Sequence, residues 1–390
     1  MKITLIGPAY PYRGGISHFN SEMARAFLEQ KGIEVQVINF HRLYPGFIFP
    51  GKTQFDESEN TFNVPSERLI DVCNPISWFR TANKINAFKP DLVFFQWWTP
   101  LTAIPYLVIA KGLKKASPLL AGLMHNIDPH ESIPLSKSLF ATFVKKLGLL
   151  VVMSRGAESK LLQNFTVAEQ NSLNVLTLFH PLYDCFKKAG NCDGKAIAKY
   201  LKNSGYTYEE LKKTRVVLFF GLIRKYKGLK KLIQALPSLN VKEKTVLLVA
   251  GEFYESKEEY LVLIKELGLE KKVVLLDSYI PNEGVSQVMD MADVLVCPYE
   301  SGEQSGVIAA ALANRLPVIT MAGKGIGEII EDGATGLLLK SNEPKNIAEK
   351  IEKFYELSEN TDFKGHIEKK NSQYSWDNFI TKILEKVNGE

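Results

Sequence analysis

Two cations lie close together in one glycine-bounded loop, Gly221-Leu222-Ile223-Arg224-Lys225-Tyr226-Lys227-Gly228. The apolar run 216–220 precedes this loop and a helical pattern begins near Leu229, which predicts that Arg224 and Lys227 lie between a strand and a helix. Arginine presents a planar fork of donors and lysine a compact positive charge, and such a pair suits a pyrophosphate. An ordinary solvated loop is the alternative, and the position directly after the strand favours anion binding.

A glycine pair occupies the same position near the beginning of the chain. Gly14 and Gly15 separate the apolar run 3–6 from a helical pattern in which Phe19 and Met23 share one face. Glycines let a ligand approach the backbone, and the N–H groups of a helix N-terminus favour an anion. The spacing is not the G-x-G-x-x-G of dinucleotide-binding folds, which argues against a nicotinamide cofactor. A tight strand–helix turn would use the same two glycines.

A third candidate is the loop that joins the apolar run 294–297 to a small-residue helix predicted for 307–314. The backbone N–H groups of Ser305, Gly306 and Val307 would be able to hold phosphate or sugar oxygens. Ser305 also fits the N-cap position of the same helix, and the two roles are compatible.

Further candidates follow apolar runs in the first half of the chain. His125 comes directly after the run 119–124, and His130 lies five residues further along. We favour a ligand contact for His125, whereas His130 is equally consistent with a structural role. Trp97 and Trp98 could line an acceptor pocket, but core packing is the more usual role of such a pair.

The elements that position these residues form two consecutive series of apolar runs and amphipathic helices. This alternation predicts two Rossmann-like, doubly wound parallel-sheet α/β domains. The first would cover residues 1–185 and the second residues 215–375, with a polar, lysine-rich linker or insert at 186–214. Because ligands of such sheets bind beyond the carboxyl ends of the strands, we expect the candidate loops to face one crevice between the domains.

Length and composition fit a two-domain globular protein of 390 residues, 45% hydrophobic and 23% charged. The four cysteines form no C-x-x-C pair, so we expect a reducing compartment and no cysteine-bound metal. Metalloprotease, serine-hydrolase and Asp-x-Asp motifs are absent from the sequence. We expect no secretory signal, because Met1 leads straight into a strand-like stretch, and no apolar run approaches the ~20 residues of a spanning helix.

The net charge of +5 is unevenly distributed. Residues 1–180 hold 18 Lys and Arg against 13 Asp and Glu, so this half carries the whole surplus. Such a surplus could attract an anionic membrane surface or a phosphorylated substrate, or it could be ordinary surface charge. In the stretch 135–150, Leu139, Phe143 and Leu147 share one helical face among several lysines. This face could lie on a membrane, although most such helices pack on a sheet.

Together these segments resemble the GT-B glycosyltransferases of family 4 (glycosyl transferases group 1), a retaining group with many bacterial polysaccharide and lipopolysaccharide enzymes. The likeness covers almost the whole chain and is clearest over residues 219–228 and 292–298, continuing through 316–319 and 328–337. A terminal Tyr374-Ser375-Trp376 motif resembles the family's closing element. The resemblance therefore implies that residues 376–390 cross back to the first domain.

The resemblance implies a reaction and its phosphate contacts. A hexosyl group would move from a UDP- or GDP-linked sugar to a polysaccharide, lipid-linked or other cell-envelope acceptor, with retention and without a metal or other cofactor. Arg224 and Lys227 would clamp the donor pyrophosphate, and Gly14 and Gly15 would approach it from the first domain. The first domain would bind the acceptor and the second the nucleotide sugar.

The resemblance also assigns the remaining contacts. The backbone at Tyr279 and Ile280 would meet the nucleotide base, and Ser305, Gly306 and Val307 would hold donor oxygens. In addition, His125 would lie near the donor sugar, where it could help to stabilise the developing cationic carbon.

One motif departs from the family pattern, the Glu-x7-Glu whose carboxylates touch the donor sugar and the ribose. If Gly306 is matched to the family's glycine, Glu303 takes the first position as a catalytic carboxylate and Ala311 takes the second. An ungapped match of the flanking prolines places Gly302 and Ala310 there instead. Both matches lack the second carboxylate, as in a subgroup with an altered loop. The nucleotide preference and the role of Glu303 therefore stay open.

Two other functions fit the same plan. A nucleotide-sugar 2-epimerase shares the two-domain arrangement, and a degenerate transferase fold could serve as a binding or scaffold protein. The matched Arg224 and Lys227 favour a transferase over both. We expect a cytoplasmic protein without a nucleic-acid partner, with peripheral contact at the inner face of the membrane as a further hypothesis.

Overall fold

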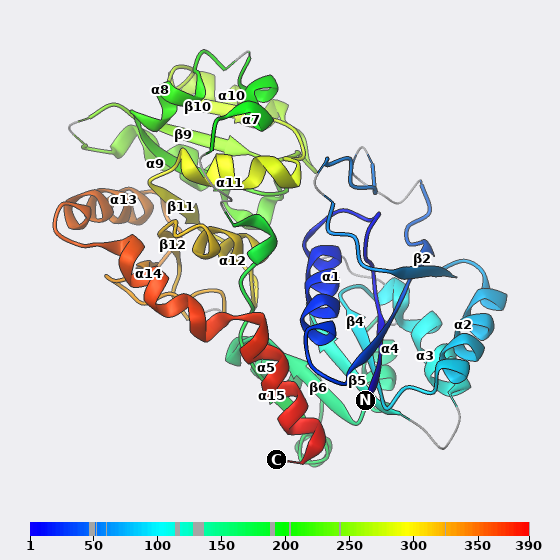
Figure 1. Ribbon diagram of the computed structural model, residues 1–390. Coiled ribbons are helices and arrows are strands. Elements are labelled where there is room, and N and C mark those ends of the chain that lie inside the picture. The colour runs from blue at the N-terminus through cyan, green and yellow to red at the C-terminus, as the bar shows by residue number, and fades with distance from the viewer. Residues whose placement is uncertain are drawn as a thin grey trace. The chain divides into compact units, whose positions relative to one another are not determined.

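The computed structural model describes the chain except residues 47–50, 52, 60, 114–117, 128–135, 188–191, 203, 242, 324 and 390. The chain divides into two compact units, and each contains its own parallel sheet (Figure 1). The first unit consists of Met1–Asp56, Thr61–His180 and Trp376–Glu390, and the second of Glu57–Asn60 and Pro181–Ser375. The predicted fold class of two doubly wound parallel-sheet domains is confirmed.

The first unit contains a seven-stranded parallel sheet. Its strands are β1 (Lys2–Ile6), β2 (Glu34–Arg42), β3 (Ser66–Asp71), β4 (Leu92–Trp97), β5 (Leu119–Met124), β6 (Leu149–Val152) and β7 (Val175–Thr177). Their order across the sheet is β3-β2-β1-β4-β5-β6-β7, so the chain starts at the centre and winds outward in both directions. Central strands of such a sheet are covered on both faces, which explains why β4 is buried along its whole length.

Helices cover this sheet on both faces. They are α1 (Gly15–Leu28), α2 (Pro75–Phe88), α3 (Ala103–Gly112), α4 (Ser136–Val144), α5 (Arg155–Leu162), α6 (Val167–Gln170) and α15 (Trp376–Asn388). Successive residues of a strand point to opposite faces. Accordingly, the Phe94 ring packs near Phe27 of α1, whereas Phe95 packs against Tyr106 of α3 and Phe143 of α4.

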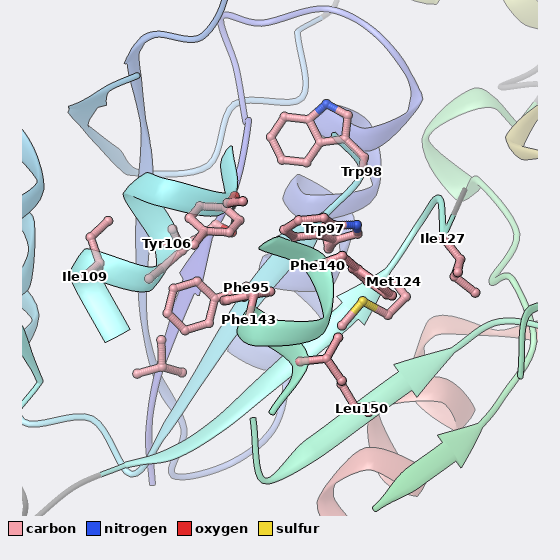
Figure 2. Packing of buried hydrophobic residues seen from close by; sticks show 14 of the residues in the cluster. Phe95, Trp97, Trp98, Tyr106, Ile109, Met124, Ile127, Phe140, Phe143 and Leu150 are labelled. Atoms are coloured by element: carbon pink, nitrogen blue, oxygen red, sulfur yellow. Dashed lines mark hydrogen bonds between the residues drawn. The ribbon is translucent and has the colours of Figure 1, made fainter. Parts of the chain in front are cut away.

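The face covered by α3 and α4 carries an aromatic core, shown in Figure 2. Trp97 stacks on Phe143 with ring centroids 5.2 Å apart and 21° between the ring planes. Both Trp97 and Trp98 are buried, so the expected core role of this pair is confirmed. Phe140 and Phe143 of α4 point into the same core. The apolar face proposed for membrane contact within 135–150 therefore packs on the sheet, and that hypothesis is wrong for this helix.

The helix α15 completes the other face of the first unit. It is the red helix that ends at the C-terminus in Figure 1, and it packs on α1. The ring of Phe19 lies 4.8 Å from that of Trp376 and 5.9 Å from that of Phe379, measured between centroids. Apolar residues at helical spacing place these two rings on the buried side of α15 together with Ile380 and Ile383.

The second unit contains a six-stranded parallel sheet. Its strands are β8 (Arg215–Phe220), β9 (Thr245–Ala250), β10 (Val273–Leu276), β11 (Val294–Cys297), β12 (Val318–Met321) and β13 (Gly336–Leu339). Their order is β10-β9-β8-β11-β12-β13, again wound outward from the first strand of the unit. The loops after the neighbouring strands β8 and β11 therefore share the carboxyl edge at the point where the winding direction changes, which is where such sheets bind ligands.

Two helices of the second unit lie in the segment 186–214, which the sequence suggests as a linker. The helices of the whole unit are α7 (Lys195–Leu201), α8 (Tyr208–Lys212), α9 (Leu229–Ala235), α10 (Glu258–Glu266), α11 (Asn282–Asp290), α12 (Gly306–Ala313), α13 (Pro344–Ser358) and α14 (Phe363–Asn371). Residues 181–214 belong to this unit, because α7 packs on α11 and α8 on β8. The Tyr208 hydroxyl donates to Asp290 Oδ2 at 2.7 Å, and Ile197 and Leu211 are fully buried. The boundary thus falls after His180 rather than after residue 185. Lysines on the outer sides of α7 and α8 make these segments look polar, so the apolar faces of the two helices are not evident in the sequence.

No helix in the described ranges combines the length and the apolar character that a membrane span requires.

Candidate active site

The loop after β8 holds the two cations at the carboxyl edge of the second sheet. A single 3-10 turn separates Arg224 from Gly228, which has a φ of 76° and precedes α9. A Cβ on Gly228 would lie 2.4 Å from the carbonyl oxygen of Pro298, so only glycine permits this approach to the β11 loop. Arg224 lies over the ring of Tyr254, with Cζ 5.1 Å from the ring centroid.

Lys227 is a buried cation with an exposed fraction of only 8%. Burial is the main reason that its pKa is lowered to about 8; the Cys297 thiol opposes this shift and the charge of Arg224 adds to it. Its Nζ lies 5.8 Å from the ring centroid of Tyr299. An anion beside this ammonium group would favour its charged form, so the site suits a negatively charged ligand.

The first turn of α12 lies beside the cation loop. A Cβ on Gly221 would lie 2.9 Å from Cγ2 of Val307 and 3.3 Å from Nζ of Lys227, so the two segments meet at this glycine. Ser305 caps the helix, because its Oγ accepts from the backbone N–H of Ile308 at 3.4 Å. The structure therefore brings together Lys227 and the residues 305–307 that the sequence identifies, and the positive end of the α12 dipole adds to the field of the cations.

The residues of the altered carboxylate motif lie in and before α12. Glu303 is buried in the loop that precedes the helix, and Gly302 before it has a φ of 147°. Gly306 packs against Tyr183, whose Cε2 would lie 2.8 Å from a Cβ at this position. Ala310 and Ala311 are buried in α12 and present no polar group, so neither match of the motif supplies a second carboxylate.

The segment expected at the nucleotide base follows β10, two strands away from β8. Ile280 is buried against Gly284, and Tyr279 is half-buried. Between these loops, β9 leads to Glu252, which is only 2% exposed and whose carbonyl accepts from the N–H of Ile223 at 2.9 Å. Glu252 is not among the residues that the sequence predicts for the site; its only signal is a carboxylate placed directly after an apolar strand.

In the first unit, the glycine pair lies at the start of α1. Gly14 is the N-cap residue with a φ of 104°, and Gly15 is the first residue of the helix. No described atom lies within 4 Å of a Cβ placed on Gly14. Glycine is therefore required there by the backbone conformation and not by close packing. The Gly14 carbonyl accepts from the N–H of His18 at 3.1 Å, which closes the first turn.

His125 follows β5 and lies on the α1 side of the first sheet. Its Nε2 lies 2.6 Å from Oε1 of Gln96, and its ring meets the edge of Phe19 with centroids 4.9 Å apart. Burial and, to a smaller extent, the neighbouring His180 lower the pKa of His125 to about 3. The imidazole is therefore neutral at physiological pH and offers a dipole, not a full positive charge.

The second candidate histidine, His130, lies outside the described residues. In the parts of the chain that are described, no three His, Cys, Asp or Glu side chains form a group that could hold a metal ion.

Sequence comparison gives a family match within the second unit and a curated relative. Residues 207–370 match the family model of glycosyl transferases group 1. Spore coat protein SA of Bacillus subtilis (strain 168) is 28% identical over 179 residues, 44% of this chain and 48% of that protein. The chain thus covers about half the length of this curated relative.

Solved structures match over the whole chain. Sucrose-phosphate synthase of Thermosynechococcus elongatus has a TM-score of 0.71 at 13% identity and covers 100% of this chain and 99% of its own. HepE of Anabaena, solved with UDP and glucose, has a TM-score of 0.72 at 19% identity and covers 100% of both chains. At these identities the likeness shows the fold. The chain therefore has the two-domain GT-B fold of glycosyltransferases, and residues 207–370, which contain Arg224, Lys227 and Ser305, match glycosyl transferases group 1.

Proposed function

We propose that this protein is a retaining, metal-independent glycosyltransferase that moves a hexosyl group from a nucleotide sugar to a glycan, lipid-linked or other cell-envelope acceptor. The observation that carries the proposal is the buried Lys227 beside Arg224 and the first turn of α12. A buried ammonium group with a lowered pKa is unfavourable without a partner, and a pyrophosphate supplies that partner. The match of residues 207–370 to glycosyl transferases group 1 supports the same reaction class.

In the proposed reaction the protein acts mainly by electrostatic stabilisation of the departing phosphate. In the reaction, the bond between the sugar carbon and the phosphate oxygen breaks while the acceptor hydroxyl attacks from the same face. Negative charge develops on the departing phosphate, where Arg224, Lys227 and the N–H groups of residues 305–307 stabilise it. The hydroxyl proton passes to the departing phosphate oxygen, so no protein base is needed. The neutral His125 contributes its dipole at the sugar.

The donor is proposed to carry uridine or guanosine. The backbone at Tyr279 and Ile280 would contact the base from the carboxyl end of β10. HepE of Anabaena, solved with UDP and glucose, supports a uridine donor as the first choice.

A thermal-shift experiment at two pH values tests the proposal. We expect one of UDP, GDP or ADP, or a sugar conjugate of it, to raise the melting temperature, because a ligand of the folded state stabilises it in proportion to ln(1 + [L]/Kd). The shift should disappear in Arg224→Ala. Lys227 is charged at pH 7 and mostly neutral at pH 9, since its pKa is about 8, so the affinity should fall several-fold between these values.

The control is Lys227→Arg, whose guanidinium stays charged at both pH values, so its nucleotide affinity should change much less. Ligand-free protein is measured at each pH. Because the Lys227 pKa is lower in the folded than in the unfolded chain, unliganded stability rises between pH 8 and 10.5. Absence of a shift with every nucleotide would contradict the proposal and favour a scaffold role. Conversion of the donor without an acceptor would favour a nucleotide-sugar 2-epimerase.

We also propose that the first unit makes peripheral contact with an anionic membrane surface. The four free cysteines of the whole chain suit a reducing cytoplasm. Helices α2 and α3 pack side by side and expose Ile76, Phe79 and Ile104, at 61%, 59% and 51%. The sequences of these two helices contain three cations and no acidic residue. Exposed apolar side chains among cations are typical of surfaces that enter the headgroup region of an anionic bilayer.

Vesicle sedimentation at low salt tests this surface. We expect the protein to sediment with phosphatidylglycerol vesicles and not with pure phosphatidylcholine vesicles. Replacing both Ile76 and Phe79 by serine should weaken binding roughly tenfold or more, because two apolar side chains are lost from the contact. The matched control replaces the exposed Leu261 and Val262 of α10 by serine. Equal binding of the two double variants would contradict the assignment to α2 and α3.

A further inference from the structure

One glutamine interrupts the apolar strand β4. Gln96 has no exposed surface, and its neighbours in the sequence Leu92-Val93-Phe94-Phe95-Gln96-Trp97 are apolar. A buried amide costs free energy unless its hydrogen bonds are made, so its partners show what holds it there.

Gln96 is the middle member of a chain of hydrogen bonds on the α1 side of the first sheet. The Asn20 amide nitrogen donates to the carbonyl oxygen of Pro8 at 3.1 Å. The Gln96 amide nitrogen donates to Oδ1 of Asn20 at 3.1 Å, and Gln96 Oε1 lies 2.6 Å from Nε2 of His125. Asn20 and Gln96 are fully buried, and His125 is 5% exposed.

The direction of these bonds follows from the carbonyl oxygen of Pro8. A carbonyl can only accept, so the amide nitrogen of Asn20 must face it, and Asn20 Oδ1 must face Gln96. The nitrogen of Gln96 then faces Asn20, and its oxygen faces His125. Because this oxygen can only accept as well, Nε2 of His125 must carry the hydrogen.

Two neighbouring residues, Gly7 and Phe19, pack closely on this series of hydrogen bonds. A Cβ on Gly7 would lie 2.5 Å from Cγ of Gln96 and 3.3 Å from Nδ2 of Asn20, so a larger residue would displace both amides. The ring of Phe19 packs on the imidazole ring of His125 in a T-shaped, edge-to-face arrangement. The backbone segment that supplies Pro8 leads into the Gly14-Gly15 turn, which links the glycine loop to the histidine through Asn20 and Gln96.

We propose that Gln96 is a positioning residue that holds His125 in the neutral tautomer with hydrogen on Nε2, so that the orientation of the imidazole dipole is fixed before the substrate binds. The proposal rests on the proposed function, in which His125 contacts the donor sugar. Gln96 acts through His125 and does not contact the substrate. A fixed dipole requires no reorientation during the reaction, which is how a polar site lowers a barrier.

Nitrogen-15 NMR of the histidine rings tests the tautomer directly. The six histidines are labelled and His125 is assigned by its loss in His125→Ala. We expect Nε2 of His125 to show the protonated, pyrrole-type signal at pH 7 and Nδ1 the pyridine-type signal. Gln96→Met has a similar volume and replaces the amide oxygen by a weakly accepting thioether sulfur, so it should give a mixture of tautomers. Gln96→Glu retains an acceptor oxygen and should retain the Nε2–H signal.

Kinetics with UDP-glucose gives a second readout, measured as UDP release. In Gln96→Met, kcat should fall roughly tenfold or more while KM changes little, because the orientation of a reacting group is lost and donor binding is kept. The matched control is Thr4→Val on β1, which removes a hydrogen bond from Thr4 Oγ1 to Gln36 Oε1 at 3.1 Å and does not touch His125. Thr4→Val should keep both the tautomer and kcat.

A wild-type signal for hydrogen on Nδ1, or an unchanged Nε2–H signal in Gln96→Met, would overturn the proposal. Failure of the proposed function has a different signature. Unchanged turnover in His125→Ala, or no binding of any nucleotide, would remove the glycosyl-transfer role, whereas the NMR measurement would still decide the tautomer.

Discussion

Arg224→Ala and Lys227→Ala are each expected to lower the rate of sugar transfer at least about tenfold, because each removes a charge that stabilises the departing phosphate. A hydrogen bond to a charged group is worth about 1.5–3 kcal/mol, which corresponds to roughly ten- to hundredfold in rate. Lys227 is buried at a cost to its own charged form, so its removal should not unfold the protein. The measurement is initial-rate kinetics together with the melting temperature of each variant.

Lys225→Ala is the matched control for both variants. Lys225 belongs to the same turn, but its side chain is exposed, whereas Lys227 is buried. If position in the site matters and not the total charge of the loop, Lys225→Ala should keep near-normal turnover. Near-normal turnover in both Arg224→Ala and Lys227→Ala would remove the proposed pyrophosphate clamp.

Phe379→Ala is expected to destabilise the first unit by about 3–5 kcal/mol, the usual cost of removing a buried aromatic ring. Phe379 has no exposed surface, and its ring centroid lies 5.8 Å from that of Trp376 and 5.9 Å from those of Phe19 and Phe179. Phe19 in turn contacts His125, so the cavity should also loosen the imidazole. Urea unfolding gives the free energy from the midpoint and slope.

The tryptophans make this measurement specific. All four lie in the first unit, at positions 78, 97, 98 and 376, so tryptophan fluorescence reports its unfolding separately from the second unit. Thr381→Ala, at an exposed position of the same helix, should change the stability by no more than about 0.5 kcal/mol. A loss below about 1 kcal/mol in Phe379→Ala would show that α15 is not part of the core of the first unit.

The fold was predictable wherever a strand is buried on both faces. β5 is a continuous apolar run and β4 is an apolar run broken by Gln96 alone, and both are evident without a structure. The edge strands β3 and β7 are different. β3 contains Glu67 and Arg68, and β7 has only three residues, so neither has the apolar pattern of a central strand. For that reason the sequence does not predict either strand.

The candidate site was predictable where residues lie next to each other in the sequence. Arg224 and Lys227 belong to one loop, and the strand before them shows where they lie. The approach of both Lys227 and Val307 to Gly221 depends on the neighbouring positions of β8 and β11, which single-sequence patterns do not give. Gln96 was missed because its role arises from Asn20 and His125, which are distant in the chain. A lone amide in an apolar strand was the available signal.

The position of α15 has a consequence for how the protein is made. Residues of this helix leave the ribosome only after the whole of the second unit, yet their burial completes the core around Phe19. The second unit can therefore fold first during synthesis, whereas the unit that begins the chain must wait for its last helix. Until then the apolar surface around Phe19 is uncovered, and such surfaces are bound by chaperones or aggregate. Premature termination anywhere before Trp376 would thus damage the first unit as well as the end of the chain.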